Sequence, residues 1–167
     1  MQVGKQGISK KEFYDMKFGP GKLSAFMPRL SQAFDVAGCG KLSIEGNTGP
    51  TQDGHRLMSL AIKQGKGDEL MEEFMKNYFI ESKAICDPDV LIAACNKVGV
   101  EQAAEFLSNP EAGAAELESE LQIAKKFQVR GVPFFIISDG VNRPCTFSGA
   151  QPPEAFKEVF EEMVGEA

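Results

Sequence analysis

The sequence changes character at Gly131, and this change most constrains the fold. Before it, from about Thr51 to Gln128, apolar residues recur at helical spacing in one segment after another. From Gly131 to Gly140 the chain reads Gly-Val-Pro-Phe-Phe-Ile-Ile-Ser-Asp-Gly, which is typical of an apolar strand closed by a turn. The segment 141–148 has the length to return antiparallel as the second strand of a hairpin. The sequence therefore predicts a helical block followed by a hairpin.

Further helices flank these two parts. Two helices are expected over 9–38, interrupted by Gly-Pro-Gly at 19–21, and a short strand is expected over about 41–46. After Gly-Ala-Gln-Pro-Pro at 149–153, a last amphipathic helix is expected. Its apolar face contains Phe156, Val159, Phe160, Met163 and Val164. Helices and strands mixed in this order indicate an α/β protein.

Composition excludes several classes of function. The length of 167 residues is typical of one domain. The net charge of −6 argues against nucleic-acid binding, because nucleic-acid-binding proteins cluster cationic side chains against the phosphates. No apolar segment is long enough to span a bilayer, so no membrane partner is expected. Residues 1–11 contain cationic side chains, but the apolar region that follows such residues in a secretory signal is missing. This segment is therefore not expected to be a secretory signal. A cytoplasmic location is expected.

The cysteines do not form a recognisable motif. They are Cys39, Cys86, Cys95 and Cys145, at intervals of 47, 9 and 50, too sparse for a disulfide scaffold. Cys86 and Cys95 are nine residues apart and could approach each other. The preferred interpretation is that both are structural thiols. With His55 as the single histidine, no metal-ligand spacing exists and no metal is expected.

Three segments carry a resemblance to a known family. They are Thr-Gln-Asp-Gly-His-Arg-Leu at 51–57, Val-Arg-Gly-Val-Pro-Phe-Phe-Ile-Ile at 129–137, and Ser-Gly-Ala-Gln-Pro-Pro-Glu-Ala-Phe at 148–156. In this order they resemble the DsbA family of thioredoxin-like proteins, in particular its FrnE-like branch. More distantly, the chain is similar to 2-hydroxychromene-2-carboxylate isomerases and kappa-class glutathione transferases.

The resemblance implies a thioredoxin-like α/β fold with an inserted helical subdomain. It implies a single domain over 1–167, in which about 51–128 is the helical insertion and about 41–46 and 129–167 are the thioredoxin-like part. In redox members of the family a Cys-x-x-Cys lies between the first strand and the first helix. This sequence contains no Cys-x-x-Cys, so we expect the first strand and catalytic helix to be missing, and the dithiol with them.

The resemblance also implies a substrate-binding region. Pro133 matches the family's cis-proline, and Val132 before it is expected to contact a substrate through its backbone. Gly149 and Gln151, in the third matching segment, are expected beside them. No catalytic residue is identified; if any thiol here were redox-active, we would choose Cys145.

Three polar residues near these motifs have alternative interpretations. His55 could face the region that binds the substrate or glutathione. The preferred interpretation is that it is a polar residue at the start of a helix. Arg56 and Arg130 either bind a substrate carboxylate or, more commonly for such residues, form surface ion pairs.

The resulting hypothesis is a thiol–disulfide oxidoreductase-family domain that is inactive or incomplete as a dithiol catalyst. Its expected partner is a protein or peptide that carries a thiol or disulfide, and no cofactor is required. The alternatives are a non-catalytic peptide-binding module and a glutathione-dependent isomerase or transferase, for which glutathione is the cofactor. Because an unpaired sheet edge invites pairing, a homodimer or strand swap through that edge is expected unless the N-terminal helices cover it.

Overall fold

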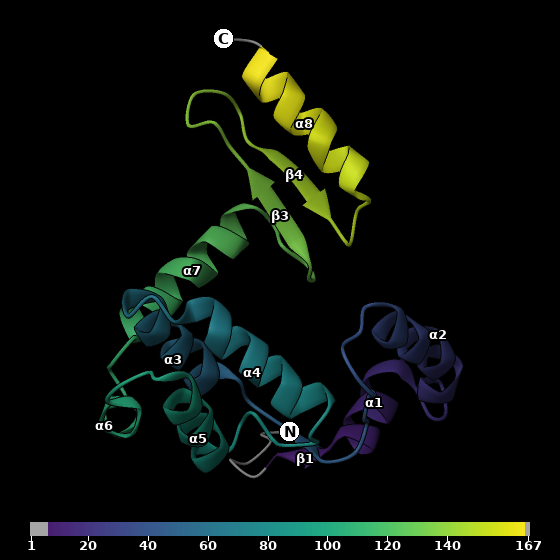
Figure 1. Cartoon of the computed structure of the whole chain (residues 1–167), viewed down its shortest axis with the longest axis vertical. Coiled ribbons are helices and arrows are strands. Elements are labelled where there is room, and N and C mark those ends of the chain that lie inside the picture. The colour runs from purple at the N-terminus through teal and green to yellow at the C-terminus, as the bar shows by residue number, and fades with distance from the viewer. Residues whose placement is uncertain (1–6, 166–167) are drawn as a thin grey trace. The chain divides into compact units, whose positions relative to one another are not determined.

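The computed structural model describes residues 7–165; residues 1–6, which belong to the segment considered above as a targeting signal, and the last two residues lie outside this range. The chain divides into two compact units, residues 1–118 and 119–167, and each is described by itself. Figure 1 colours the chain by residue number from the first unit to the second. The prediction of one domain over the whole chain stays a prediction.

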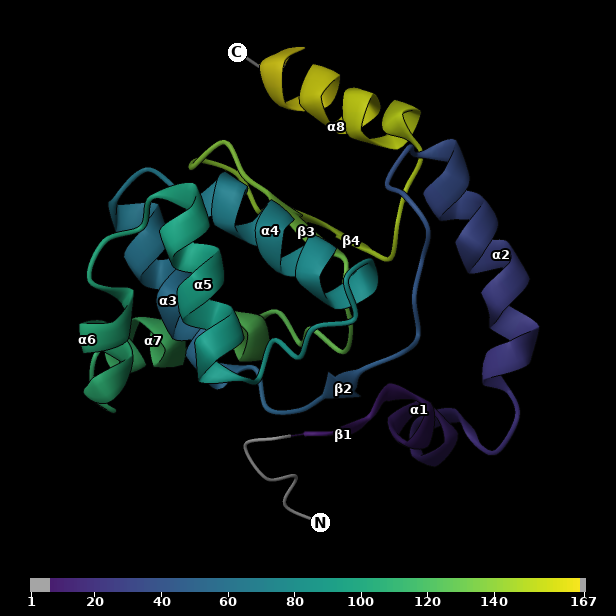
Figure 2. The ribbon, with the colours of Figure 1, turned by 60° about the horizontal axis from the view of Figure 1, so that its bottom comes forward.

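The first unit begins with two short strands that enclose a helical pair. Its elements in order are β1 (Ile8–Ser9), α1 (Lys10–Phe18), α2 (Leu23–Val36) and β2 (Asn47–Thr48). β1 lies beside β2 (Figure 2). The two strands pair antiparallel, with Ile8 opposite Thr48. The two helices are separated at 19–22, where the sequence predicts the interruption. The pairing brings the start of α1 next to the segment that precedes the next helix.

Four helices form the core of the first unit. They are α3 (Gln52–Lys63), α4 (Gly67–Phe79), α5 (Pro88–Val98) and α6 (Ala103–Ser108). They lie side by side in both ribbon views (Figure 1, Figure 2). Their inward faces supply the buried core, which consists of Leu57, Ala61, Leu70, Phe74, Leu91, Ala94, Cys95, Val100 and Ala103. Burial of this apolar surface stabilises the unit.

Helix α5 illustrates how local sequence sets the ends of these helices. The Asp87 side chain accepts a hydrogen bond of 2.9 Å from the Asp89 amide, and Pro88 occupies the first turn. Gly99 ends the helix with φ +80°, a left-handed conformation that glycine adopts without steric cost. The sequence predicts both ends of α5 for these reasons.

The strand predicted over about 41–46 is wrong. The residues that pair in a ladder are Asn47 and Thr48. The Ser43 amide instead donates a hydrogen bond of 2.7 Å to the Phe79 carbonyl at the end of α4. Leu42 and Ile44, together with Ser43 between them, line an apolar cavity. An extended segment whose backbone forms a hydrogen bond with a helix end can have the same alternating sequence pattern as a β-strand.

The second unit contains a hairpin and a helix. After the end of α7 (Ala114–Lys126), which crosses the boundary between the units, come β3 (Phe134–Ile137), β4 (Cys145–Ser148) and α8 (Pro153–Gly165). The strands are antiparallel, with Phe134 opposite Ser148. The Phe156 ring of α8 contacts Phe135 and Phe147, with ring centroids 4.9 and 5.2 Å apart. No helix within residues 7–165 combines the length and apolar character needed to cross a bilayer.

Candidate functional site

Four of the predicted site residues meet at the open end of the hairpin. The Val132–Pro133 peptide bond is cis, the isomer expected from the sequence. The Gly149 amide donates a hydrogen bond of 2.9 Å to the Pro133 carbonyl, which extends the ladder by one pair beyond β3 and β4. Gln151 donates from Nε2 to the Ser148 carbonyl at 3.1 Å and so folds back on the end of β4. The structure thus brings Val132, Pro133, Gly149 and Gln151 together.

The hydrogen bond at Pro133 determines which backbone groups of β3 remain available. In an antiparallel ladder, bonded and non-bonded pairs alternate. Since Pro133 and Gly149 form a bonded pair, the amides of Phe135 and Ile137 point toward β4. The N–H and C=O groups of Phe134 and Ile136 consequently point to the opposite edge. Within the described residues, β4 is the only strand that pairs with β3, so this edge has no strand partner.

Val132 is highly accessible in this region. Its side chain is 90% exposed, and no hydrogen bond joins its backbone to another described residue. Its amide and carbonyl therefore have no backbone partner in the described part of the chain, directly before Pro133. We define the β3 edge as the outward-facing backbone of Phe134 and Ile136 together with the unbonded backbone of Val132 that precedes them. Such an edge can add an extended peptide as a further strand.

Cys145 lies at the other end of the hairpin. It pairs with Ile137, which follows Pro133 by four residues. At the rise of a β-strand, this separation corresponds to roughly 13 Å. Cys145 is half-buried. The structure thus does not place this thiol beside Val132 and Pro133, where a thiol would act on a substrate held at the β3 edge.

His55 lies in the first unit, in the first turn of α3. Its side chain is exposed, and its amide donates a hydrogen bond of 3.0 Å to the Thr51 carbonyl as part of the helix start. No described residue forms a hydrogen bond with its imidazole. These contacts are those of a polar residue at a helix start, which is the preferred interpretation of the sequence.

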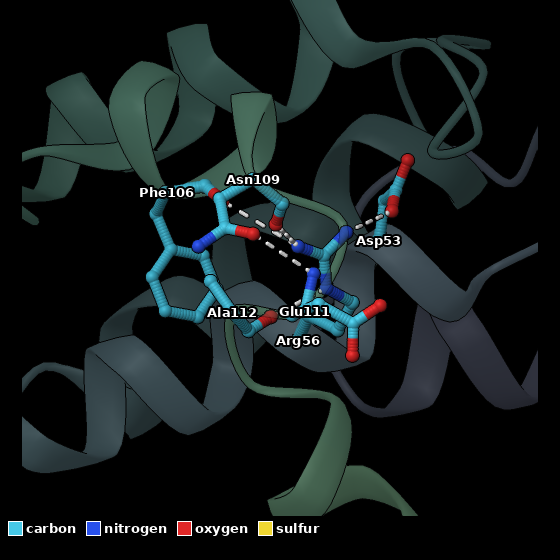
Figure 3. A network of polar contacts seen from close by, with 6 residues as sticks. All are labelled: Asp53, Arg56, Phe106, Asn109, Glu111 and Ala112. Atoms are coloured by element: carbon cyan, nitrogen blue, oxygen red, sulfur yellow. Dashed lines mark hydrogen bonds and ion pairs between the residues drawn. The ribbon is translucent and has the colours of Figure 1, made fainter.

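Arg56 forms an ion pair, as the preferred interpretation expects, but its side chain is buried rather than at the surface. It is 7% exposed, and its guanidinium points into the loop that follows α6 (Figure 3). Nε donates to the Ala112 carbonyl at 2.6 Å, and Nη2 donates to the carbonyls of Phe106 and Asn109. Nη1 forms an ion pair with Asp53 at 2.8 Å. Arg56 therefore fastens residues 106–112 to α3, whereas Arg130 in the second unit is exposed.

Two of the four thiols are buried. Cys86 and Cys95 are 6% and 0% exposed, and all four cysteines are free. Burial raises the pKa of the Cys95 thiol to about 11 and also raises the pKa of Cys86, because a thiolate is disfavoured away from water. Both are therefore thiols near neutral pH, which supports the interpretation as structural residues. Among the described residues, no cluster of three potential ligands could hold a metal ion.

The sequence analysis did not single out Lys10, a polar residue that the structure buries. Lys10 is 1% exposed although it occupies the first position of α1. It borders a cavity whose wall also contains Tyr14 and Tyr78. No local pattern marks a lysine at a helix start for burial, because its burial depends on residues about 70 positions away.

Comparisons with known proteins agree with this geometry. A family model described as "DSBA-like thioredoxin domain" matches residues 5–161. Among solved structures, a probable DsbA oxidoreductase from Streptomyces coelicolor matches with a TM-score of 0.84 and 24% sequence identity. The match covers 99% of this chain and 71% of that chain, and it establishes a common fold. No curated protein sequence matches at a significant level. The chain belongs to the DsbA-like thioredoxin domain family and has its thioredoxin-like α/β fold.

Proposed function

We propose that the chain binds an extended peptide or protein segment along the β3 edge, as the substrate-holding part of a thiol–disulfide oxidoreductase of the FrnE-like branch. The observation that carries this proposal is the free backbone of Val132 at the start of an unpaired strand. Main-chain hydrogen bonds to such an edge bind a peptide with little dependence on its side chains. A protein or peptide with a thiol or disulfide is the substrate that the family suggests.

The chain has the binding surface of this function without its dithiol. The sequence contains no Cys-x-x-Cys, and the two buried thiols, Cys86 and Cys95, have raised pKa values. Disulfide exchange needs a thiolate within reach of the bound disulfide. Cys145, half-buried and at the far end of the hairpin, is badly placed to supply it. We therefore propose that this chain holds substrates but does not exchange disulfides by itself.

Proline substitutions at Ile136 and Thr146 test the use of the β3 edge. These residues lie opposite each other as a non-bonded pair, so each points its N–H away from the other strand. Ile136→Pro removes an N–H from the β3 edge, and Thr146→Pro removes an N–H from the outer edge of β4. Both side chains are exposed, and neither change removes a bond of the hairpin. The two variants thus form a matched pair.

Binding is measured by the fluorescence anisotropy of a short fluorescein-labelled peptide rich in Val and Thr, with circular dichroism to verify folding. Ile136→Pro is expected to weaken binding about fivefold, which corresponds to about 1 kcal/mol for one hydrogen bond, while Thr146→Pro leaves it unchanged. The same peptide N-methylated at alternate residues should bind weakly to the unaltered protein. Equal binding of the methylated peptide, or an equal loss in both variants, would contradict the proposal.

An insulin-reduction assay tests the missing exchange activity. In the presence of dithiothreitol, insulin is expected to precipitate at the rate set by dithiothreitol alone, because the chain supplies no reactive dithiol. An acceleration that Cys145→Ser abolishes would show that Cys145 is reactive and that the chain is a catalyst. Peptide binding is measured independently, so this result would leave the proposal for the β3 edge standing.

A second copy of the chain is another occupant that we propose for the β3 edge. Two edges pairing antiparallel would join the hairpins of two copies into one four-stranded sheet. Light scattering is expected to give the mass of a dimer at high concentration, which Ile136→Pro reduces to that of a monomer and Thr146→Pro does not. A monomer at every concentration would remove the dimer but would leave peptide binding unaffected.

We also propose a cytoplasmic location. All four cysteines are free, and a reducing compartment preserves thiols in this state. Fractionation of cells that produce the tagged protein should place it with cytoplasmic markers. Recovery with an extracytoplasmic fraction would contradict the location.

A further inference from the structure

The first unit contains an apolar cavity of about 250 Å³ that is separate from the β3 edge. It lies among α1, α2, the extended segment at 42–44 and the end of α4. Its wall is formed largely by apolar side chains, among them Phe18, Leu23, Phe26, Leu30, Leu42 and Phe79. Phe18, Phe26 and Leu30 remain 40%, 49% and 42% exposed, so this side of the cavity is open to solvent.

The cavity contains one buried cation. Lys10 lines it and is 1% exposed. Its Nζ donates a hydrogen bond to the Tyr78 carbonyl and lies 3.9 Å from the centroid of the Tyr78 ring. Desolvation lowers the pKa of Lys10 from its ordinary value, and no acidic group among the described residues offsets this effect.

Lys10 has no acidic partner among the described residues, whereas several more exposed lysines of the first unit have one. Lys11 forms an ion pair with Glu45 at 2.7 Å, and Lys97 forms one with Glu73 at 2.7 Å. No carboxylate of residues 7–165 lies within ion-pair distance of Lys10. An ammonium removed from water without an anion costs free energy, and an anion that enters the site recovers part of that cost. The charge of the cavity therefore favours a negatively charged ligand.

The two tyrosines of the cavity add no negative charge beside Lys10. The Tyr78 hydroxyl donates to Thr48 Oγ1 at 3.1 Å, which fixes the ring below the Lys10 ammonium. Burial, together with the neighbouring Tyr78 phenol, raises the pKa of Tyr14 to about 12. Tyrosine is a neutral phenol at physiological pH even at its ordinary pKa of 10.0, so Tyr14 adds no negative charge that would compete for Lys10.

We infer that this cavity binds a small amphipathic carboxylate, with the carboxylate paired to Lys10 and the apolar part lying among Phe18, Phe26 and Leu30. A cavity of 150 Å³ accommodates benzene, so 250 Å³ corresponds to a ligand of about ten non-hydrogen atoms. Octanoate has this size. The inference is independent of peptide binding at the β3 edge, because every residue that carries it lies in the first unit.

Three ligands of one chain length separate the contribution of charge from that of apolar contact. Isothermal titration calorimetry with the full chain is expected to show that octanoate binds about tenfold more tightly than octan-1-ol, because its hydrogen bonds to Lys10 are charge-assisted. Octylamine, which brings a second cation to the site, is expected to bind least tightly. Equal affinity for octanoate and octan-1-ol, or no binding of octanoate, would overturn the inference.

Lys10→Met and Lys11→Met form a matched pair of variants. Each removes one positive charge and keeps the aliphatic stem, but only Lys10 lines the cavity. Lys10→Met should bind octanoate and octan-1-ol equally, whereas Lys11→Met should keep the tenfold difference. A difference that persists in Lys10→Met would place the carboxylate elsewhere and overturn the assignment. If Lys10→Met does not fold, the order of the three ligands on the unaltered protein still decides the inference.

Discussion

Arg56 and Asp53 lie one turn apart on α3, with Arg56 Nη1 2.8 Å from Asp53 Oδ1, and the same guanidinium binds the backbone of the loop after α6. Arg56→Met should lower the free energy of unfolding by about 3 kcal/mol, because it leaves Asp53 and several carbonyl oxygens without a donor. Urea unfolding measures the change. Arg130→Met, at an exposed position, should change stability by less than about 0.5 kcal/mol. Equal effects of the two substitutions would show that the network does not stabilise the fold.

Gly46 is expected to be intolerant of a side chain. Its φ is +81°, and a Cβ atom would lie 1.9 Å from the Ser82 carbonyl oxygen. Gly46→Ala should therefore destabilise the protein by more than 2 kcal/mol, roughly the upper cost of the left-handed conformation alone. Gly21→Ala is the control, since Gly21 has φ +71° but no atom within 4 Å of a Cβ. Similar urea midpoints for the two variants would contradict the predicted clash.

The thiols are expected to differ in their reactivity. At pH 8, iodoacetamide should modify the exposed Cys39 first, while Cys86 and Cys95 react only after unfolding, because burial protects them and raises their pKa values. Mass spectrometry of peptides from a labelling time course gives the order. Rapid modification of Cys95 in the folded protein would show that its helix opens readily.

Tyr14 gives the stability a dependence on alkaline pH. Its pKa of about 12 exceeds the ordinary value of 10.0, so between pH 10 and 12 the unfolded chain loses the phenolic proton while the folded chain retains it. The folded state then binds more protons, and its stability falls as the pH rises through this range. Tyr14→Phe should lose less stability over the same range. Absorbance at the phenolate band follows the titration directly, since the chain has two tyrosines and no tryptophan.

Features set by neighbouring residues were predictable from the sequence. The ends of α5 follow from Asp87, Pro88 and Gly99, and the hairpin follows from the apolar segment before Asp139 and Gly140. The grouping of Val132, Pro133, Gly149 and Gln151 was expected from the family resemblance. The signals for α5 and the hairpin act within a few residues, and tertiary packing does not oppose them.

Features set by distant residues were not predictable. The ladder of β1 and β2 has two residues on each strand, too few for an alternating pattern. The burial of Lys10 depends on Tyr78, and the contacts of Arg56 depend on residues 106–112. A lysine or arginine near a helix start has the same local sequence whether it faces solvent or a distant loop.

The ring of Phe156 against Phe135 and Phe147 is the centre of the second unit, and yet none of residues 119–165 is fully buried. Leu57, Leu70 and Leu91 of the first unit, in contrast, have no exposed surface. The amides of β3 and β4 should therefore exchange with deuterium far faster than those of α3, α4 and α5, through openings that leave the helical core intact. If a peptide binds as an added strand, local opening of the hairpin would release it rapidly, as a site that binds and releases successive chains requires.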